Sequence, residues 1–497
     1  MNAATSPREG VELAWLLAGL VAAPRIAVRN LTLDSREVQH GDAFVALAGR
    51  TTHGLDHLDE AIARGAVAVI WDPAEGRALP PLPPSVTAVS VPGLRPELGD
   101  VADRFYGEPS AEADVAAITG TNGKTTCAWL YAVCRGADGA YLGTLGQGRP
   151  PALTATSHTT MDAVSVHRAL RALIDRGARH VGMEVSSHAL DQERVAGVRT
   201  PLTAFTNLTR DHLDYHGTMA AYGAAKERLF HGRGVEHAII HVGDEFGRGL
   251  AQRLPPGVEL TRVAIGAPPP LGRHVTATAV EGRSDGLLLT GSTHAGPFRL
   301  RSPLIGAFNA ENLLVALGLL LAAGQPLAAA LEALGAARPP PGRMETFALG
   351  AHGPTLVVDY AHSPDALAKV LAALRPHAHG ALWCVFGCGG DRDTGKRPLM
   401  AKAAEAGADR LVVTDDNPRT EDPDRIIAMI TAALSGRVPA HVERDRASAI
   451  RFAATTARAG DVVVIAGKGH EDYQIIGAER RAYSDRDVAR ALAEAAR

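Results

Sequence analysis

The sequence predicts an α/β protein of about three domains built mainly on parallel sheets. Its 497 residues suffice for three domains at roughly 100–200 residues each. Short apolar runs alternate with helical patterns along most of the chain, which is typical of right-handed βαβ units. A glycine-rich turn also joins one apolar run directly to a helix, which is the setting of a phosphate-binding loop.

The first hundred residues are expected to form a small α/β domain, residues 1–100. Their apolar periods predict, in order, a helix at 11–22, strands at 29–33 and 43–47, a helix at 58–64 and a strand at 66–71. Prolines between 80 and 96 mark the end of this domain.

Two larger domains follow, and a proline-rich linker at 336–343 separates them. In the central domain, 101–338, we expect strands at 115–119 and 181–185, a helix from Lys124, and helices at 220–230 and 310–323. In the C-terminal domain, 339–497, we expect strands at 355–359, 381–386, 410–414 and 461–466 with helices between them.

Composition excludes several classes of function. The 51 basic residues nearly balance the 54 acidic ones, and a net charge of −3 lacks the basic excess of nucleic-acid and anionic-membrane binders. The most apolar runs, 13–23 and 313–323, are about half the roughly 20 residues that a bilayer span needs. The four cysteines form no CxxC pair, so we expect reduced thiols and a cytoplasmic protein.

The glycine-rich turn predicts a nucleotide site. In Ile118-Thr-Gly-Thr-Asn-Gly-Lys-Thr-Thr126 the backbone N–H groups of the turn can cradle phosphates, Lys124 can neutralise them, and the Thr125 hydroxyl can bind Mg²⁺. The alternative is an ordinary glycine-rich strand-to-helix turn. The loop is shorter than the common GxxxxGK pattern, which would need glycine where Ile118 stands.

That loop resembles the ATP site of the Mur ligase superfamily, which includes the folylpolyglutamate synthetases. Six further stretches resemble central-domain motifs of the superfamily: 183–190 (MEVSSHAL), 207–214 (NLTRDHLD), 222–230 (YGAAKERLF), 306–312 (GAFNAEN), 341–345 (PGRME) and 358–362 (VDYAH). Three more resemble its MurE type: 31–36 (LTLDSR), 415–419 (DDNPR) and 467–471 (GKGHE). The resemblance implies an N-terminal UDP-binding domain, a central P-loop ATPase-like domain and a C-terminal Rossmann-like domain that binds an amino acid.

The resemblance also implies the residues that handle ATP and Mg²⁺. Glu184, at the end of a predicted strand, could bind Mg²⁺ beside Thr125, and His212 could support a second metal ion. Lys226 is implied to react with CO₂, because a carbamate is a hard oxygen ligand whereas an ammonium group is not; the alternative is a solvent-facing helix lysine. The implied catalytic residues are Lys124, Glu184, His212 and Lys226, and the implied ATP-binding residues are Gly120, Thr121, Asn122, Gly123, Lys124, Thr125, Thr126, Asn309, Arg343 and Asp359.

The implied acceptor is UDP-N-acetylmuramoyl-L-alanyl-D-glutamate. Its UDP end would contact Leu33, Ser35, Arg50, Thr51 and Thr52, and its muramoyl-peptide would contact His158, Thr159, Thr160, Ser186, Gln192 and Arg194. A turn or cap role is the alternative for an isolated hydroxyl such as that of Ser35. Two positions depart from the family pattern: His53 stands where Asp is usual, and Met161 where Pro is usual.

The implied reaction is an ATP-dependent amide-bond formation in peptidoglycan synthesis. ATP would phosphorylate the D-glutamyl side-chain carboxylate, an amine would attack the acyl phosphate, and phosphate would leave. We expect a monomer that uses neither nucleic acid nor membrane. Two rivals are a folylpolyglutamate synthetase, which would lack the N-terminal domain, and a P-loop regulatory NTPase, which would not need the two C-terminal motifs.

The incoming amine is expected to be that of meso-diaminopimelate, and not of L-lysine, which lacks the distal carboxylate. Arg419 could grip that carboxylate with two parallel hydrogen bonds, while Asp416 and Glu471 could take the distal ammonium. The full predicted set is Arg392, Asp416, Asn417, Pro418, Arg419, Gly467 and Glu471. The alternative is a turn whose charges face water.

Overall fold

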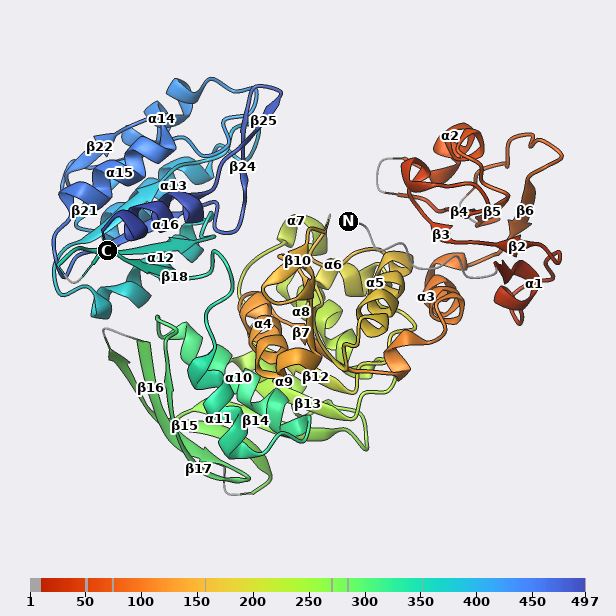
Figure 1. Ribbon diagram of the computed structural model, residues 1–497, viewed down its shortest axis with the longest axis horizontal. Helices are drawn as coiled ribbons and strands as arrows, with labels where there is room; N and C mark the ends of the chain where they lie inside the picture. The colour runs from red at the N-terminus through yellow and green to blue at the C-terminus, as the bar shows by residue number, and fades with distance from the viewer. Residues whose placement is uncertain are drawn as a thin grey trace. The chain divides into compact units, whose positions relative to one another are not determined.

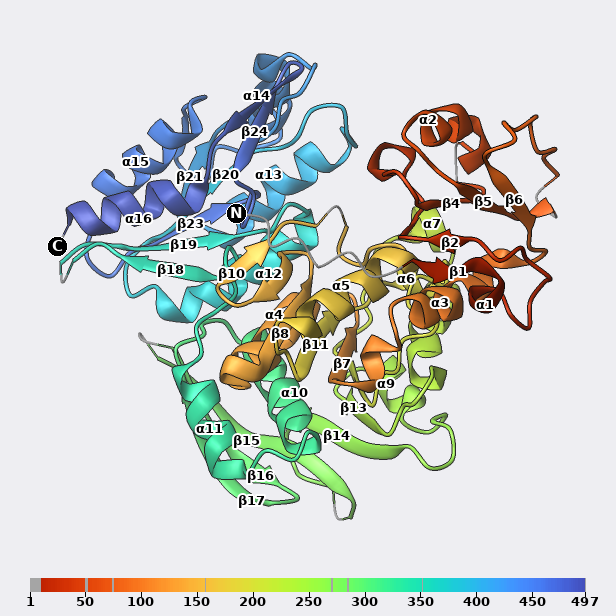
Figure 2. The same ribbon diagram turned by 45° about the vertical axis from the view of Figure 1, so that its right-hand side comes forward.

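The computed structural model describes residues 10–49, 52–73, 76–156, 158–269, 271–283, 286–350 and 352–496. Contacts divide the chain into two compact units. One runs up to Val263 and includes Gly318–Gln325, and the other comprises Ala264–Leu317 and the chain from Pro326 onward. Figure 1 and Figure 2 show the elements of both units from two directions.

The first unit begins with a four-stranded parallel sheet in the order β3-β4-β5-β6. Its elements are β1 (Val11–Glu12), α1 (Leu13–Leu16), β2 (Ala27–Val28), β3 (Leu31–Thr32), β4 (Ala43–Ala46), α2 (Leu58–Ala63), β5 (Ala68–Trp71), β6 (Thr87–Ser90) and α3 (Leu94–Phe105). Of the helix predicted at 11–22 only Leu13–Leu16 is helical, because Val11 and Glu12 pair with β2 and the chain leaves the helix before Gly19, which takes a φ of 89°.

The first unit continues with eight strands of an eleven-stranded sheet, in the order β10-β9-β8-β11-β7-β12-β13-β14, parallel from β8 to β14. Its strands are β7 (Asp114–Thr119), β8 (Gly139–Gly143), β9 (Gly146–Arg149), β10 (Ala152–Thr154), β11 (His180–Glu184), β12 (Leu202–Phe205), β13 (His237–His241) and β14 (Glu259–Ile265). Its helices are α4 (Lys124–Cys134), α5 (Ala163–Asp175), α6 (Ser187–Asp191), α7 (Leu213–His216), α8 (Met219–Glu227) and α9 (Glu245–Leu250).

The apolar core of this sheet includes Val115, Ala117, Val181 and Met183, which are fully buried. Because β7 and β11 are sheltered on both faces, their residues form the continuous apolar runs that predicted them.

The second unit contains antiparallel strands that the sequence analysis did not predict. They are β15 (Arg273–Arg283), β16 (Gly286–Thr293) and β17 (Gly296–Ser302), and each pairs with the next. The helices that follow are α10 (Phe308–Ala322), whose residues up to Leu317 belong to this unit, and α11 (Leu327–Ala336).

The C-terminal part of the second unit is a six-stranded sheet in the order β18-β19-β23-β20-β21-β22, parallel except for the edge strand β18. Its strands are β18 (Glu345–Ala348), β19 (Thr355–Asp359), β20 (Leu382–Phe386), β21 (Arg410–Val413), β22 (Ala440–Val442) and β23 (Val462–Ala466), with the hairpin β24 (Tyr473–Ile476) and β25 (Glu479–Ala482). Its helices are α12 (Pro364–Leu374), α13 (Lys396–Gly407), α14 (Pro423–Thr431), α15 (Arg446–Thr456) and α16 (Asp485–Ala495).

Alternate residues of these strands enter two separate cores. Val464 belongs to the core formed with α12, α13 and α14, whereas Val463 and Ile465 belong to the core formed with α15 and α16. The sheet is therefore covered on both faces, and its side chains can reach a ligand only at the strand ends.

Candidate active site

Four parallel strands of the first unit end at one edge of the sheet, and each is followed by a polar segment. Thr144 follows β8, Glu184 ends β11, the glycine-rich loop 120–123 follows β7, and Asn207 lies just after β12. The carboxyl edge of a parallel sheet is where ligands of α/β proteins bind, so this edge is the candidate nucleotide site.

The conformation of the loop is held by the segment after β12. Gly120 has a φ of 145°, and a Cβ there would lie 1.9 Å from Thr206 Oγ1. The N–H of Thr121 donates to the carbonyl of Asn207 at 2.8 Å, and the N–H of Asn122 donates to Asn207 Oδ1 at 3.0 Å. Only glycine fits the first position, because any side chain would collide with the neighbouring strand end.

The helix that follows the loop points its N-terminus toward the same edge. Gly123 takes a φ of 88° and α4 begins at Lys124, so the unpaired N–H groups of the first helical turn lie beside the loop. Such a helix start favours an anion, and a polyphosphate is the anion that fits a Gly-Lys-Thr sequence at this position.

Thr125 and Glu184 lie together at this edge as predicted. The Thr125 hydroxyl donates to Glu184 Oε2 at 2.9 Å, and both side chains are buried. Glu184 Oε1 accepts from the Tyr141 hydroxyl and, at 2.9 Å, from the N–H of Thr144. Hydroxyl and carboxylate oxygens are ligands that Mg²⁺ prefers, so this pair fits the ion that the sequence implies.

Two lysines converge on the carbonyl oxygen of Gly120. Lys124 Nζ lies 2.9 Å from it and Lys226 Nζ 2.8 Å from it. Lys226 is only 1% exposed, and its Nζ lies 4.4 Å from the centre of the Tyr222 ring. Burial, and then the charge of Lys124, hold the pKa of Lys226 well below its usual value. Lys226 is therefore not a solvent-facing helix lysine.

His212 lies near Tyr222, the ring that Lys226 contacts, but at the protein surface. It precedes α7 with a φ of 52°, its side chain is 47% exposed, and its ring centre lies 4.9 Å from that of His188. Burial, and then the neighbouring His212 and His216, lower the pKa of His188 to about 4. Among the residues that the structure describes, no three His, Cys, Asp or Glu side chains gather as a metal site. The predicted metal ligands are of mixed kinds, because they include Thr125 and Lys226 besides Glu184 and His212.

The residues predicted to bind the muramoyl-peptide adjoin the nucleotide edge. The Thr160 hydroxyl donates to the carbonyl of Glu184 at 2.9 Å and accepts from the N–H of Ser186 at 3.1 Å. Arg194 donates through Nη1 to the carbonyl of Thr160 at 2.9 Å and through Nε to Gln192 Oε1 at 3.0 Å.

Thr159 and His158 complete this group. The Thr159 hydroxyl lies 2.9 Å from that of Thr144, and His158 is exposed. Met161, which replaces the usual proline, packs against the central apolar core. The structure thus brings this predicted set next to Glu184.

The residues predicted for the UDP end lie in the N-terminal sheet region. The Ser35 hydroxyl donates to Glu60 Oε2 at 2.7 Å, Leu33 packs against the apolar core, and Thr52 is exposed. Arg50 and Thr51 fall outside the described residues. His53, which replaces the usual aspartate, accepts from the N–H of Leu55 through Nδ1 at 3.1 Å and so caps a short helix.

The second unit holds the other predicted ATP residues. Asn309 is buried in α10, and its Nδ2 donates to the carbonyl of Ile305 at 2.8 Å. Arg343 lies over the Tyr360 ring at 4.5 Å. Asp359 accepts from the N–H of Met344 at 2.9 Å, and burial raises its pKa.

The second unit also holds the predicted amino-acid pocket. The loop after β21 carries Asp416 and Arg419, and the loop after β23 carries Gly467 and Glu471. Asn417 connects the two loops, because its Nδ2 donates to Glu471 Oε2 at 3.2 Å. β20 lies between β21 and β23 and is parallel to both, so both loops leave the same carboxyl edge of the sheet.

The cationic side of this pocket is formed around Arg419. Arg419 takes a φ of 53°, and its Nη1 donates to the carbonyl of Gly390 at 2.8 Å. Pro418 precedes it and is buried, whereas Arg392 is exposed. A Cβ on Gly389 would lie 2.9 Å from Arg419 Nη1 and 3.9 Å from Arg392 Cγ, so both arginines flank the same glycine.

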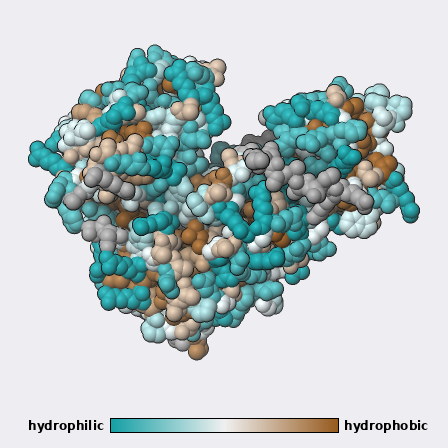
Figure 3. Space-filling view, in the orientation of Figure 1, coloured by the Kyte–Doolittle hydropathy of each residue, from teal (hydrophilic) through white to brown (hydrophobic). Residues whose placement is uncertain are grey.

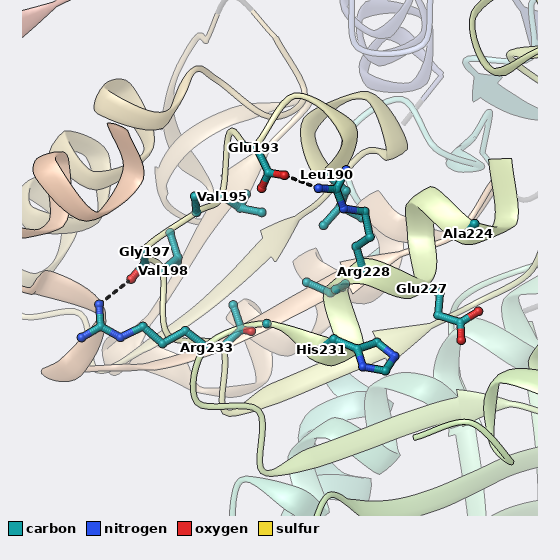
Figure 4. Close-up of a pocket in the computed structure, with 14 residues that line it drawn as sticks. Leu190, Glu193, Val195, Gly197, Val198, Ala224, Glu227, Arg228, His231 and Arg233 are labelled. Atoms are coloured by element: carbon teal, nitrogen blue, oxygen red, sulfur yellow. Dashed lines mark hydrogen bonds and ion pairs between the residues drawn. The ribbon is translucent and has the colours of Figure 1, made fainter. Parts of the chain in front are cut away.

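A separate pocket of about 420 Å³ lies in the first unit (Figure 4). Ala224 lines it from α8, on the helix face opposite Lys226, and Arg228, directly after α8, pairs with Glu193 at its rim. None of the 14 lining residues belongs to the predicted site.

Sequence reasoning missed several side chains that shape these sites. Tyr141 and Thr144 hold Glu184, and Lys468 lies within the amino-acid pocket. The position of Thr144 directly after a strand could have revealed it, whereas nothing local in the sequence points Tyr141 toward Glu184.

No helix of the described chain is both long and apolar enough to cross a membrane. On the face seen in Figure 3, hydrophilic residues predominate and hydrophobic ones form small groups.

Models of the Mur ligases match most of the chain. The model of the Mur ligase family catalytic domain matches residues 27–106, the Mur ligase middle domain matches 118–320, and the Mur ligase glutamate ligase domain matches 342–469. The predicted resemblance is thereby confirmed, while the boundaries at 100 and 338 stay predictions.

Curated relatives match over nearly their whole length. A protein of Xylella fastidiosa is 46% identical over 97% of each chain, and one of Alkalilimnicola ehrlichii is 47% identical over 94% of this chain and 95% of its own. Both are called UDP-N-acetylmuramoyl-L-alanyl-D-glutamate--2,6-diaminopimelate ligase.

Solved structures agree with the fold. A solved ligase with the same description has a TM-score of 0.71 and 35% identity, over 98% of this chain and 99% of its own. MurF from Acinetobacter baumannii has a TM-score of 0.64 at 19% identity, over 93% of this chain and 96% of its own, which supports the fold alone. The predicted three-domain α/β fold is confirmed.

Proposed function

The chain belongs to the Mur ligase family, and from that membership we propose that it is an ATP-dependent ligase that adds meso-diaminopimelate to the D-glutamate of UDP-N-acetylmuramoyl-L-alanyl-D-glutamate. The names of the relatives support the substrates. The observation that carries the proposal is that Lys124, Thr125, Glu184 and Lys226 surround one phosphate loop.

The reaction has two steps. The D-glutamyl side-chain carboxylate attacks the γ-phosphorus of ATP, so that an acyl phosphate forms and ADP leaves. The neutral amine of the amino acid then attacks the acyl carbon and loses one proton, the amide bond forms, and phosphate leaves with the bonding electrons of the broken C–O bond. Lys124 and the N–H groups of loop 120–123 stabilise the charge on the transferring phosphoryl group.

Thr125 and Glu184 are the residues that would hold Mg²⁺, with His212 as a candidate ligand for a second ion. When bound, Mg²⁺ neutralises phosphate oxygens during the transfer. Tyr141 and Thr144 keep the Glu184 carboxylate oriented toward Thr125, so the oxygen ligands are arranged by the protein itself.

The amino-acid pocket is proposed to bind both charged groups at the distal end of meso-diaminopimelate. Arg419, supported by Arg392, would bind the distal carboxylate, and Asp416 and Glu471 would bind the distal ammonium. Lysine offers no carboxylate to Arg419, so we propose that it is a poor substrate.

Lys226 is proposed to act as a carbamate. Its neutral amine adds to the carbon of CO₂ to form the N–C bond and releases one proton. Burial and the nearby Lys124 support this step, because both favour the neutral amine that reacts. The resulting carbamate anion would attract the Lys124 ammonium and supply oxygen ligands at the loop.

The carbamate is tested by Lys226→Ala. Turnover should be nearly abolished, and a small carboxylate added to the assay should restore part of it, because it replaces the missing oxygen ligands. Lys402→Ala, at an exposed position of α13, is the matched control. Full activity of Lys226→Ala without additive would contradict the proposal, and ¹³C NMR of the wild type in labelled bicarbonate reads the carbamate independently of turnover.

The overall function is tested by ADP release. Release should require both the UDP-muramoyl-dipeptide and meso-diaminopimelate, and the product should carry the mass of both substrates joined with loss of water. A regulatory NTPase would release ADP in the absence of both substrates. A folylpolyglutamate synthetase would release ADP at a rate that does not depend on the UDP-peptide. We also propose that the enzyme acts as a cytoplasmic monomer, which light scattering of the purified protein checks.

A further inference from the structure

Lys468 is a fully buried lysine at the centre of the amino-acid pocket. Gly467 and Gly469 on either side take φ values of 124° and 52°, so the chain turns sharply and directs the lysine inward. Its Nζ donates to Asn417 Oδ1 at 2.9 Å and to the carbonyl of Tyr473 at 2.8 Å. A lysine with no exposed surface is rare unless its charge is matched.

Two carboxylates match that charge, and they are the two proposed to bind the distal ammonium. Lys468 Nζ lies 3.5 Å from Asp416 Oδ1 and 3.6 Å from Glu471 Oε2. Asp416 Oδ1 is buried and accepts no hydrogen bond from the described residues. The three side chains together carry one net negative charge, which is the complement of one ammonium group.

We propose that Lys468 is a positioning residue that keeps Asp416 and Glu471 ionised and sets the pocket charge to −1, so that the pocket accepts an amino acid with a single distal ammonium. Lys468 does not touch the substrate in this scheme. It acts through the carboxylates and through Asn417, whose oxygen it holds while the Asn417 amide donates to Glu471. The inference rests on the proposed function.

The surroundings of Glu471 support this role. Burial raises the pKa of Glu471, and Lys468 opposes that rise whereas Asp416 adds to it. Without the lysine, two close carboxylates would remain in a buried pocket, and one of them would hold a proton at a higher pH. The other charged or titratable groups around these side chains include Tyr360, Cys388, Arg419, Arg446, Tyr473 and Asp485, of which Arg446 and Asp485 already pair with each other.

The test is Lys468→Gln, because glutamine can still donate to Asn417 and Tyr473 but carries no charge. The acid limb of kcat/KM for meso-diaminopimelate should move to higher pH by about one unit or more. The KM for meso-diaminopimelate should rise about tenfold near pH 7 and return toward the wild-type value near about pH 8.5, where both carboxylates are ionised. The KM values for ATP and for the UDP-peptide should stay within about twofold.

Two further variants make the result decisive. Lys369→Met, at an exposed ion pair on α12, is the control and should leave the pH profile unchanged. Lys468→Gln combined with Glu471→Gln leaves Asp416 as the only carboxylate, so the acid limb should return to its wild-type position. If Lys468→Gln does not fold, the double variant should fold, because its pocket no longer holds two unbalanced charges.

The proposal is overturned if Lys468→Gln folds and keeps the acid limb of the wild type, or if its loss of kcat/KM is equal at all pH values. It is also overturned if the double variant fails to fold, or folds without returning the acid limb to its wild-type position. Absence of meso-diaminopimelate-dependent ADP release in the wild type would instead overturn the proposed function.

Discussion

Removal of one partner from the buried pair of Arg446 and Asp485 should strongly destabilise the C-terminal sheet. Asp485→Asn removes the negative charge while keeping the shape of the side chain. Both residues are fully buried, and Arg446 donates to the two carboxylate oxygens through Nε and Nη2, each at 2.8 Å. The substitution leaves a buried guanidinium without its counter-charge, which costs about 3–5 kcal/mol.

That loss should be visible in both unfolding and catalysis. At roughly 2–4 °C per kcal/mol for a domain of this size, the melting transition should fall by roughly 6–20 °C. Arg446 Nη2 also donates to the carbonyl of Ala466 at 2.9 Å, directly before Gly467, so the KM for the amino acid should rise. Differential scanning calorimetry and ADP-release kinetics measure the two effects.

A matched control and a compensating variant test the reasoning. Asp487→Asn, on the same helix but 68% exposed and paired with Arg490, should cost less than about 1 kcal/mol. Arg446→Met combined with Asp485→Leu should recover most of the lost stability, because no unpaired charge remains. If Asp485→Asn melted no lower than Asp487→Asn, the assigned cost of the unpaired charge would be wrong.

Two other substitutions address the two binding sites. Arg419→Ala should abolish the preference for meso-diaminopimelate over lysine, because the distal carboxylate loses its guanidinium partner, and the ratio of the two kcat/KM values measures this; a preference that survives the change would exclude Arg419 as the reader of that carboxylate. Gly120→Ala should abolish ADP formation and destabilise the first unit by about 1–3 kcal/mol, because the added Cβ would collide with Thr206 Oγ1. Gly257→Ala shares a positive φ but meets nothing within 4 Å, so it should keep full activity, and equal losses in both glycine variants would refute the collision.

The sequence identified most elements of the parallel sheets. The strand predicted at 355–359 has those bounds as β19, and the predicted strand 461–466 differs from β23 by one residue. Both are continuous apolar runs between polar loops, because each strand is buried on both faces. The antiparallel strands β15–β17 escaped prediction, since β15 is mostly exposed beyond its first half and β16 has only four buried residues in a row, so neither shows a long apolar run or strict alternation.

The sequence identified most residues of the candidate site, but not the contacts that hold them in place. Lys124, Thr125 and Glu184 were expected from a loop motif and a strand end, and the structure joins the last two. The contact of Tyr141 with Glu184 could not be predicted, because it joins residues 43 positions apart through the pairing of β8 with β11. Lys468 stood inside a motif, but its burial depends on the loop after β21.

The loop 120–123 is shaped entirely by contacts with the protein's own chain, chiefly with Thr206 and Asn207. The conformational entropy of its four residues, on the order of 1–2 kcal/mol each, is therefore lost when the protein folds and not when a nucleotide binds. Residues that do not contact the nucleotide thus contribute to its affinity, because they hold the loop in its ordered conformation. A change at Asn207 would weaken binding by loosening the loop, and a map of nucleotide contacts alone would not reveal why.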